Sequence, residues 1–157
     1  PDQPVGGVTW DDAQRFCEWA GVRLPTEAQW EYACRAGTDT RYWSGPKESD
    51  LNRVGWIYKN SGGALQSVAR KPANPFGLFD MHGNVWEWCA DWYGEYSKKR
   101  KQDPTRSSGG SLRVVRGGGF WGGADRCRSA SRDGFHPSFT AFYLGFRVAL
   151  PAAPSQS

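Results

Sequence analysis

Four cysteines and two histidines are the side chains of this sequence best suited to metal or redox chemistry. The cysteines are Cys17, Cys34, Cys89 and Cys127, and no two of them form a Cys-x-x-Cys pair. That spacing argues against a structural zinc site, and two histidines are too few for a multi-histidine iron or copper centre. The cysteines are therefore either buried thiols or the halves of one or two long-range disulfides.

Nucleophilic catalysis has little support in the sequence. His136 could act as a general base, but no serine or cysteine nucleophile with an orienting carboxylate can be paired with it. A lone histidine next to a proline, as at Pro137, is more often a surface or packing residue. The residues alone give no positive sign of an enzyme.

The composition indicates one folded domain. The chain has 157 residues, the usual size of a single domain. Its mean hydropathy is low, at −0.69, but nine Trp, six Tyr and eight Phe can bury enough area to exclude a disordered chain. Twenty Gly and ten Pro place much of the backbone in turns and loops. No apolar run is long enough for a membrane span, and the first residues show no signal peptide.

The formal net charge is +4, and basic residues concentrate in the C-terminal part of the chain. The densest run is 98–101, Lys-Lys-Arg-Lys. We interpret it as a solvated loop, because no aromatic residue lies within it to stack on bases. Nucleic-acid binding is therefore not expected.

Two short amphipathic helices are predicted near the start. Thr9 and Asp12 begin the first, which stops at Gly21, and Thr26 and Gln29 begin the second, which stops near Gly37. Residues 38–75 lose periodicity, and strands are predicted at 85–88, at 112–116 and within 139–150. These predicted helices and strands together indicate a compact α+β domain over residues 1–150, followed by a short tail at 151–157. The apolar helix faces are Ala13, Phe16, Cys17 and Ala20, then Trp30, Ala33 and Cys34.

Seven sequence runs, in order, resemble the formylglycine-generating-enzyme (sulfatase-modifying factor) superfamily. They are 8–13, 23–33, 76–81, 83–88, 115–118, 127–130 and 145–147, which read VTWDDA, RLPTEAQWEYA, FGLFDM, GNVWEW, VRGG, CRSA and GFR. The resemblance implies a variant of the C-type-lectin fold, with a small twisted antiparallel sheet, two short helices and abundant ordered loop. Members of the family also carry further residues upstream, so the N-terminal part of the domain is expected to be missing here.

The resemblance also bears on catalysis. Oxidases of this family bind copper through a cysteine pair that follows the Arg-Gly-Gly strand, and thiolates suit Cu(I). Residues 119–126 contain no cysteine. We therefore expect no copper and no formylglycine-generating activity. The alternative is a copper-dependent oxidase that activates sulfatases.

Calcium and a disulfide are further implications of the resemblance. Asp80, Gly83, Val85 and Glu87 match a family calcium loop, and carboxylate and carbonyl oxygens suit Ca²⁺; they could equally hydrogen-bond the loop backbone. Cys34 and Cys127 match a family bridge, either as a disulfide or as adjacent thiols. Cys17 matches another bridge whose partner position here is Val148, and Cys89 has no counterpart.

The segment 119–143 is rich in aromatic residues set among small polar ones, as binding loops are. We expect these residues to share one face and bind a partner, most simply a protein. The arrangement also resembles the variable proteins of diversity-generating retroelements, which display such a surface between an Arg-Gly-Gly strand and a terminal Gly-Phe-Arg. The predicted contacts are Phe120, Trp121, Asp133, Phe135, His136, Ser138, Phe139, Phe142 and Tyr143.

Overall fold

The computed structural model describes residues 2–96 and 108–151. The basic run 98–101 and most of the predicted tail lie outside the described residues. The structure confirms the α+β class, with three helices and a four-stranded sheet. No helix among the described residues is both long and apolar enough to cross a membrane.

The first two helices form where local sequence signals predict them. Helix α1 (Trp10–Ala20) has a capping box between Thr9 and Asp12 and ends at Gly21 in the left-handed conformation. Helix α2 (Glu27–Arg35) has the same arrangement between Thr26 and Gln29 and is capped by Ala36, next to the predicted stop at Gly37. A third helix, α3 (Glu48–Val54), lies in the segment that the sequence left without regular structure.

The sheet is built from β1 (Trp86–Trp92), β2 (Arg113–Arg116), β3 (Arg132–Phe135) and β4 (Leu144–Phe146), in the order β3-β2-β1-β4. Two of its pairings are antiparallel, as expected, but β4 runs parallel to β1, so the sheet is mixed. The chain can pair these strands in parallel because a long connection, including the short helix η1 (Ala124–Cys127), separates them.

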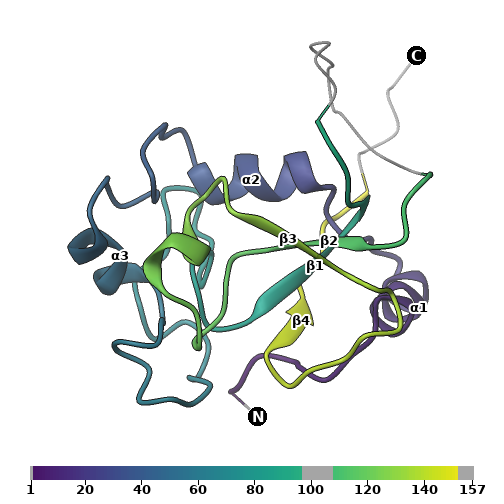
Figure 1. The fold of residues 1–157 in the computed structure, drawn as a ribbon, viewed down its shortest axis with the longest axis horizontal. Helices are drawn as coiled ribbons and strands as arrows, with labels where there is room; N and C mark the ends of the chain where they lie inside the picture. The colour runs from purple at the N-terminus through teal and green to yellow at the C-terminus, as the bar shows by residue number, and fades with distance from the viewer. Residues whose placement is uncertain (1, 97–107, 152–157) are drawn as a thin grey trace.

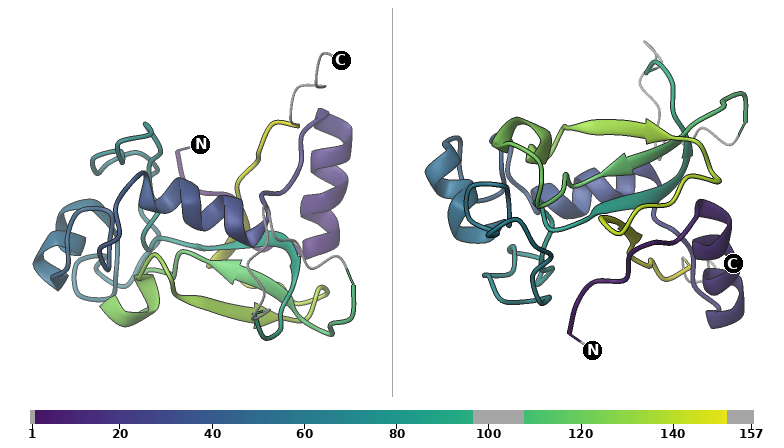
Figure 2. Two further views of the ribbon diagram at one scale, coloured as in Figure 1. Left: turned by 90° about the horizontal axis from the view of Figure 1, so that it is seen from above. Right: turned by 60° about the horizontal axis from the view of Figure 1, so that its bottom comes forward.

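Helix α2 packs on β1 and β2 and covers one face of the sheet (Figure 1). Helix α1 stands beyond the N-terminal end of α2, and α3 lies at the opposite end of the molecule (Figure 2). Trp30 of α2 and Trp88 of β1 are almost completely buried and belong to two apolar clusters, one on each side of β1. This core fixes the sheet that carries the candidate site described below.

Candidate functional site

Eight of the nine predicted contact residues retain access to solvent. Trp121 and Phe142 are each 56% exposed and Phe139 is 37% exposed, which are large values for aromatic side chains. Phe120 is the exception, because it is fully buried. Its prediction as a contact residue is wrong: Phe120 packs beneath the rings of Trp121 and Phe142 and supports them, with centroids 5.5 and 5.8 Å away.

Ring contacts pair the accessible aromatic residues, and one hollow lined by Trp121, Phe135 and Tyr143 brings the three pairs together. Phe135 stacks on Phe139 with 4.8 Å between centroids, and Phe142 meets Tyr143 edge-on at 5.4 Å. The surface includes one residue that the sequence did not indicate, Tyr58, which stacks on Trp121 at 5.9 Å. We call this surface the aromatic patch; its members are Tyr58, Trp121, Asp133, Phe135, His136, Ser138, Phe139, Phe142 and Tyr143.

A hollow of about 290 Å³ lies within the aromatic patch. Trp121, Phe135 and Tyr143 form aromatic walls. Arg126 and Asp133 add a half-exposed ion pair, with Nη1 2.9 Å from Oδ2. The hollow is large enough for one side chain and is both apolar and charged. Trp86 lines it as well, although most of its side chain is buried in the core.

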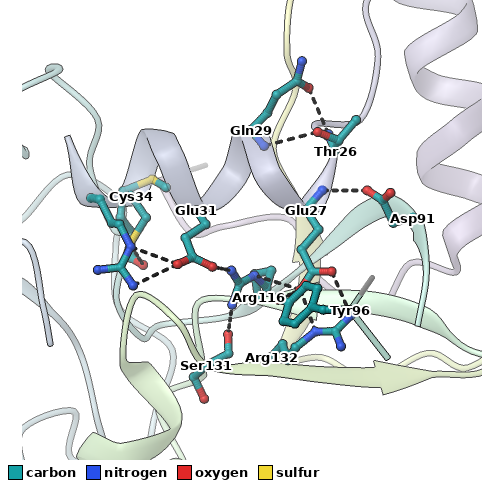
Figure 3. A network of polar contacts seen from close by, with 12 residues as sticks. Thr26, Glu27, Gln29, Glu31, Cys34, Asp91, Tyr96, Arg116, Ser131 and Arg132 are labelled. Carbon is teal, nitrogen blue, oxygen red and sulfur yellow. Dashed lines mark hydrogen bonds and ion pairs between the residues drawn. The ribbon is translucent and has the colours of Figure 1, made fainter. Parts of the chain in front are cut away.

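Strand alternation explains how β3 presents its part of the patch. Asp133 and Phe135 point to one face of the strand, and Arg132 points to the other, toward α2. There the Arg132 guanidinium donates two hydrogen bonds to Glu27, at 2.6 and 2.8 Å. Figure 3 shows this contact within the polar network between α2 and the sheet. The ion pair therefore fixes the strand whose opposite face carries the site.

Arg116, at the end of β2, anchors the start of β3 in the same network (Figure 3). Its side chain is completely buried, pairs with Glu31 and donates to the Ser131 carbonyl oxygen. The chain then turns through Gly117 and Gly118. A Cβ at Gly118 would lie 2.5 Å from the Cys127 sulfur, so only glycine fits there. This turn delivers residues 119–122 to the hollow.

His136 lies at the edge of the patch and hydrogen-bonds locally. Its Nδ1 is 2.7 Å from the Ser138 hydroxyl oxygen, two residues away. Such a contact shapes the loop, and no acidic side chain among the described residues hydrogen-bonds the ring to complete a catalytic triad.

The residues of the predicted calcium loop line a second hollow, of about 370 Å³. Glu87 is already engaged there: Arg147 donates to its two oxygens at 2.5 and 2.7 Å, and the Trp30 indole donates at 2.7 Å. Burial alone would lower the pKa of Arg147, but the charge and hydrogen bonds of Glu87 raise it. Glu87 thus has a cationic partner within the protein.

Asp80 offers the freer carboxylate in that loop. One oxygen accepts the Ala69 amide at 2.8 Å, whereas Oδ1 is buried and has no hydrogen-bond partner among the described residues. Burial raises the pKa of Asp80. An unpartnered carboxylate oxygen fits a hard cation, although no group of three His, Cys, Asp or Glu among the described residues could hold a metal.

Cys34 and Cys127 are free, buried thiols that flank His82. The His82 ring lies 3.8 Å from the Cys34 sulfur, and its Nδ1 is 2.8 Å from the Cys127 carbonyl oxygen. Burial raises the pKa of each thiol to about 12 and lowers that of His82 to about 4. All three groups are therefore neutral near pH 7, and a neutral thiol is a weak nucleophile.

A third, mostly apolar hollow of about 800 Å³ lies between α1, α2 and the segment after β4. Phe16, Trp30, Phe146 and Val148 contribute to its walls. None of the predicted site residues lines it, and it holds no cluster of nucleophilic or metal-binding side chains.

Comparisons with known proteins agree with the architecture. The family described as sulfatase-modifying factor enzyme 1-like domain matches residues 1–152. The serine/threonine-protein kinase pkn1 of Chlamydia pneumoniae is 39% identical over 150 residues, which cover 93% of this chain and 24% of the kinase. The formylglycine-generating enzyme of Bos taurus is 35% identical over 173 residues, covering 99% of this chain and 46% of the enzyme.

A solved structure, that of Treponema denticola variable protein 1, is similar with a TM-score of 0.85 and 28% identity. The match covers 94% of this chain and 70% of that protein. The chain spans about a quarter of the length of the kinase and about half that of the enzyme. The similarity therefore includes both a protein named as an enzyme and a protein named as variable.

Proposed function

The chain belongs to the sulfatase-modifying factor enzyme 1-like domain family, and on that premise we propose that it is a non-catalytic domain that binds a partner protein through the aromatic patch. The exposed aromatic rings around the 290 Å³ hollow are the observation that carries this proposal. Such clusters are uncommon on a protein surface unless they serve as an interface. Rigid aromatic side chains also give large contact areas at a low entropic cost.

The composition of segment 119–126 supports a binding function over an oxidase. The segment lacks the cysteine pair that the family's oxidases use, and the two nearby thiols are buried and protonated. Similarity to a protein named as variable supports the same choice. In the variable-protein form of the proposal, patch side chains change between versions of the domain while the Arg116 network keeps the backbone in place.

Alanine substitutions in the patch are expected to remove binding without unfolding the domain. Trp121→Ala and Phe142→Ala each delete a ring that is more than half exposed, so the free energy of unfolding should change by less than about 1 kcal/mol. If the rings are central to the interface, each change should cost about 2 kcal/mol or more of binding, roughly a 30-fold loss of affinity.

The partner can be identified with a photo-crosslinking amino acid at position 139, and its dissociation constant then measured for each variant. Trp19→Ala is the matched control, because Trp19 is 83% exposed on α1, its ring contact is with Phe16, and it does not line the hollow. Equal affinities for the wild-type protein and both patch variants would refute the proposal.

We expect the protein not to generate formylglycine. A peptide carrying the sulfatase cysteine motif should keep its thiol after incubation with the protein, copper and oxygen, because no solvent-accessible thiolate pair is present among the described residues. Mass spectrometry of the peptide reads the result. Conversion of the cysteine to an aldehyde would favour the oxidase alternative.

Calcium binding is proposed for the loop that contains Asp80, Gly83, Val85 and Glu87. Asp80 would supply the anionic ligand through Oδ1, together with loop carbonyl oxygens. At a hundred-fold excess over its dissociation constant, calcium should add about 2.7 kcal/mol of stability. Thermal unfolding in calcium and in chelator measures the effect, and Asp80→Asn should abolish it while the exposed Asp125→Asn should not. An unchanged melting temperature in calcium would contradict the assignment.

A further inference from the structure

The hollow in the aromatic patch contains hydrogen-bond donors that the protein itself does not use. One guanidinium nitrogen of Arg126 donates a hydrogen bond to Asp133, and the other guanidinium nitrogens have no partner among the described residues. The Trp86 indole nitrogen lies beside Gly119, which lines the hollow, at 3.6 Å from where a Cβ would stand. The described residues provide neither that indole nor the Tyr143 hydroxyl with a hydrogen-bond partner. The three residues that carry these unused donors all line one small space.

The acceptors of the same hollow are already occupied. Asp133 receives Arg126 on Oδ2 and the Gly134 amide on Oδ1, at 2.9 Å each. The Gly119 carbonyl oxygen accepts the Gly122 amide at 2.8 Å. A ligand that supplies acceptors therefore complements the unused donors, and the free edge of a guanidinium favours a negatively charged one.

The surroundings restrict the size and origin of that ligand. About 290 Å³ accommodates one side chain, and the aromatic walls of Trp121 and Phe135 would pack against its apolar stem. The Arg126–Asp133 pair is half exposed, so it is weak and can open. The exposed rings of Phe139 and Phe142 lie outside the hollow and are available to pack against the partner residues on either side of the inserted side chain.

We infer that the hollow binds the carboxylate of an aspartate or glutamate side chain that the partner protein inserts between Trp121, Phe135 and Arg126. This inference rests on the proposed function and adds the chemistry of the partner. Arg126 pairs with the carboxylate, the Trp86 indole and the Tyr143 hydroxyl donate to its oxygens, and the patch rings cover the flanking residues.

The test uses two capped peptides, acetyl-Phe-Glu-Phe-amide and acetyl-Phe-Gln-Phe-amide, titrated into the whole ¹⁵N-labelled chain. The glutamate peptide should bind at least tenfold more tightly and shift the indole N–H signals of Trp86 and Trp121. Arg126→Gln should reduce that preference to about onefold. Arg15→Gln, which removes the same charge from an exposed site on α1, should leave the preference unchanged.

Asp133→Asn gives a second, opposite expectation. Asparagine keeps the Oδ1 acceptor for Gly134 but frees Arg126 from its internal carboxylate, so the affinity for the glutamate peptide should rise severalfold. A fall in that affinity, or equal binding of the two peptides, would overturn the inference. So would glutarate binding as tightly as the peptide, because the site would then select a free acid.

The outcomes separate this inference from the proposed function. If Trp121→Ala abolishes binding of the crosslinked partner and Arg126→Gln does not, the patch is the interface but the carboxylate assignment is wrong. If neither substitution affects that partner, the proposed function itself fails.

Discussion

Replacing Arg116 with Met is expected to lower the free energy of unfolding by roughly 3–5 kcal/mol, because it breaks a buried ion pair by removing one partner. The Arg116 side chain is fully buried and pairs with Glu31, while its Nε lies 3.6 Å from Glu27. Methionine keeps much of the apolar part of the side chain, so the decrease in the free energy of unfolding measures mainly the loss of the guanidinium charge. For a chain of this size the melting temperature should fall by roughly 6–20 °C.

Arg35→Met is the matched control. Arg35 pairs with the same Glu31, at 2.8 Å, but its side chain is 27% exposed. Because this pair is partly exposed and solvent screens it, it should contribute about 1 kcal/mol or less. Denaturant unfolding of the two variants compares the same substitution beside the same carboxylate at two depths. Equally small losses would show that the buried position of Arg116 does not matter.

The same network links stability to function. Arg116 donates a hydrogen bond to the Ser131 carbonyl oxygen, and Glu27 accepts hydrogen bonds from Arg132. Asp133 and Phe135, which follow in β3, line the hollow. Loosening Arg116 should therefore disturb that wall of the site even under conditions in which the domain stays folded. Substitutions of the exposed patch rings should weaken binding without lowering the free energy of unfolding, because those rings contribute little to the core.

Local signals in the sequence were sufficient for the parts of the fold that depend on neighbouring residues. Both capping boxes and the strand at β2 were predictable because their determinants lie within a few positions of one another. Helix α3 was not predictable, because Lys47 provides no side-chain cap to mark its start. The parallel pairing of β4 depends on contacts with β1 almost sixty residues away.

The same difference between local signals and distant contacts applies to the candidate site. Residue types located the aromatic patch, but spacing alone could not tell Phe120, which faces inward, from Trp121, which faces outward. Tyr58 was missed because it reaches the patch from a distant segment, where its backbone amide donates to the Gly122 carbonyl oxygen at 3.2 Å. The partners of Glu87 were likewise hidden, since Trp30 and Arg147 come from opposite ends of the chain.

Glu87→Gln is expected to lower the free energy of unfolding by roughly 3–5 kcal/mol, because it leaves the Arg147 guanidinium without its countercharge. Glu87 is 5% exposed, and both of its oxygens are in hydrogen bonds. Glutamine keeps one acceptor but turns an amide donor toward the guanidinium donors. A double-mutant cycle with Arg147→Met measures the coupling between the two side chains directly.

The dependence of that loss on calcium distinguishes the two roles that Glu87 can have. If the Arg147 ion pair is its main function, unfolding in calcium and in chelator should show the same loss. If Glu87 is chiefly a calcium ligand, the loss should be large in calcium and nearly vanish in chelator, because the metal stabilises only the folded state that binds it. The short contacts to Arg147 and Trp30 favour the first result, with Asp80 as the side chain on which any calcium effect depends.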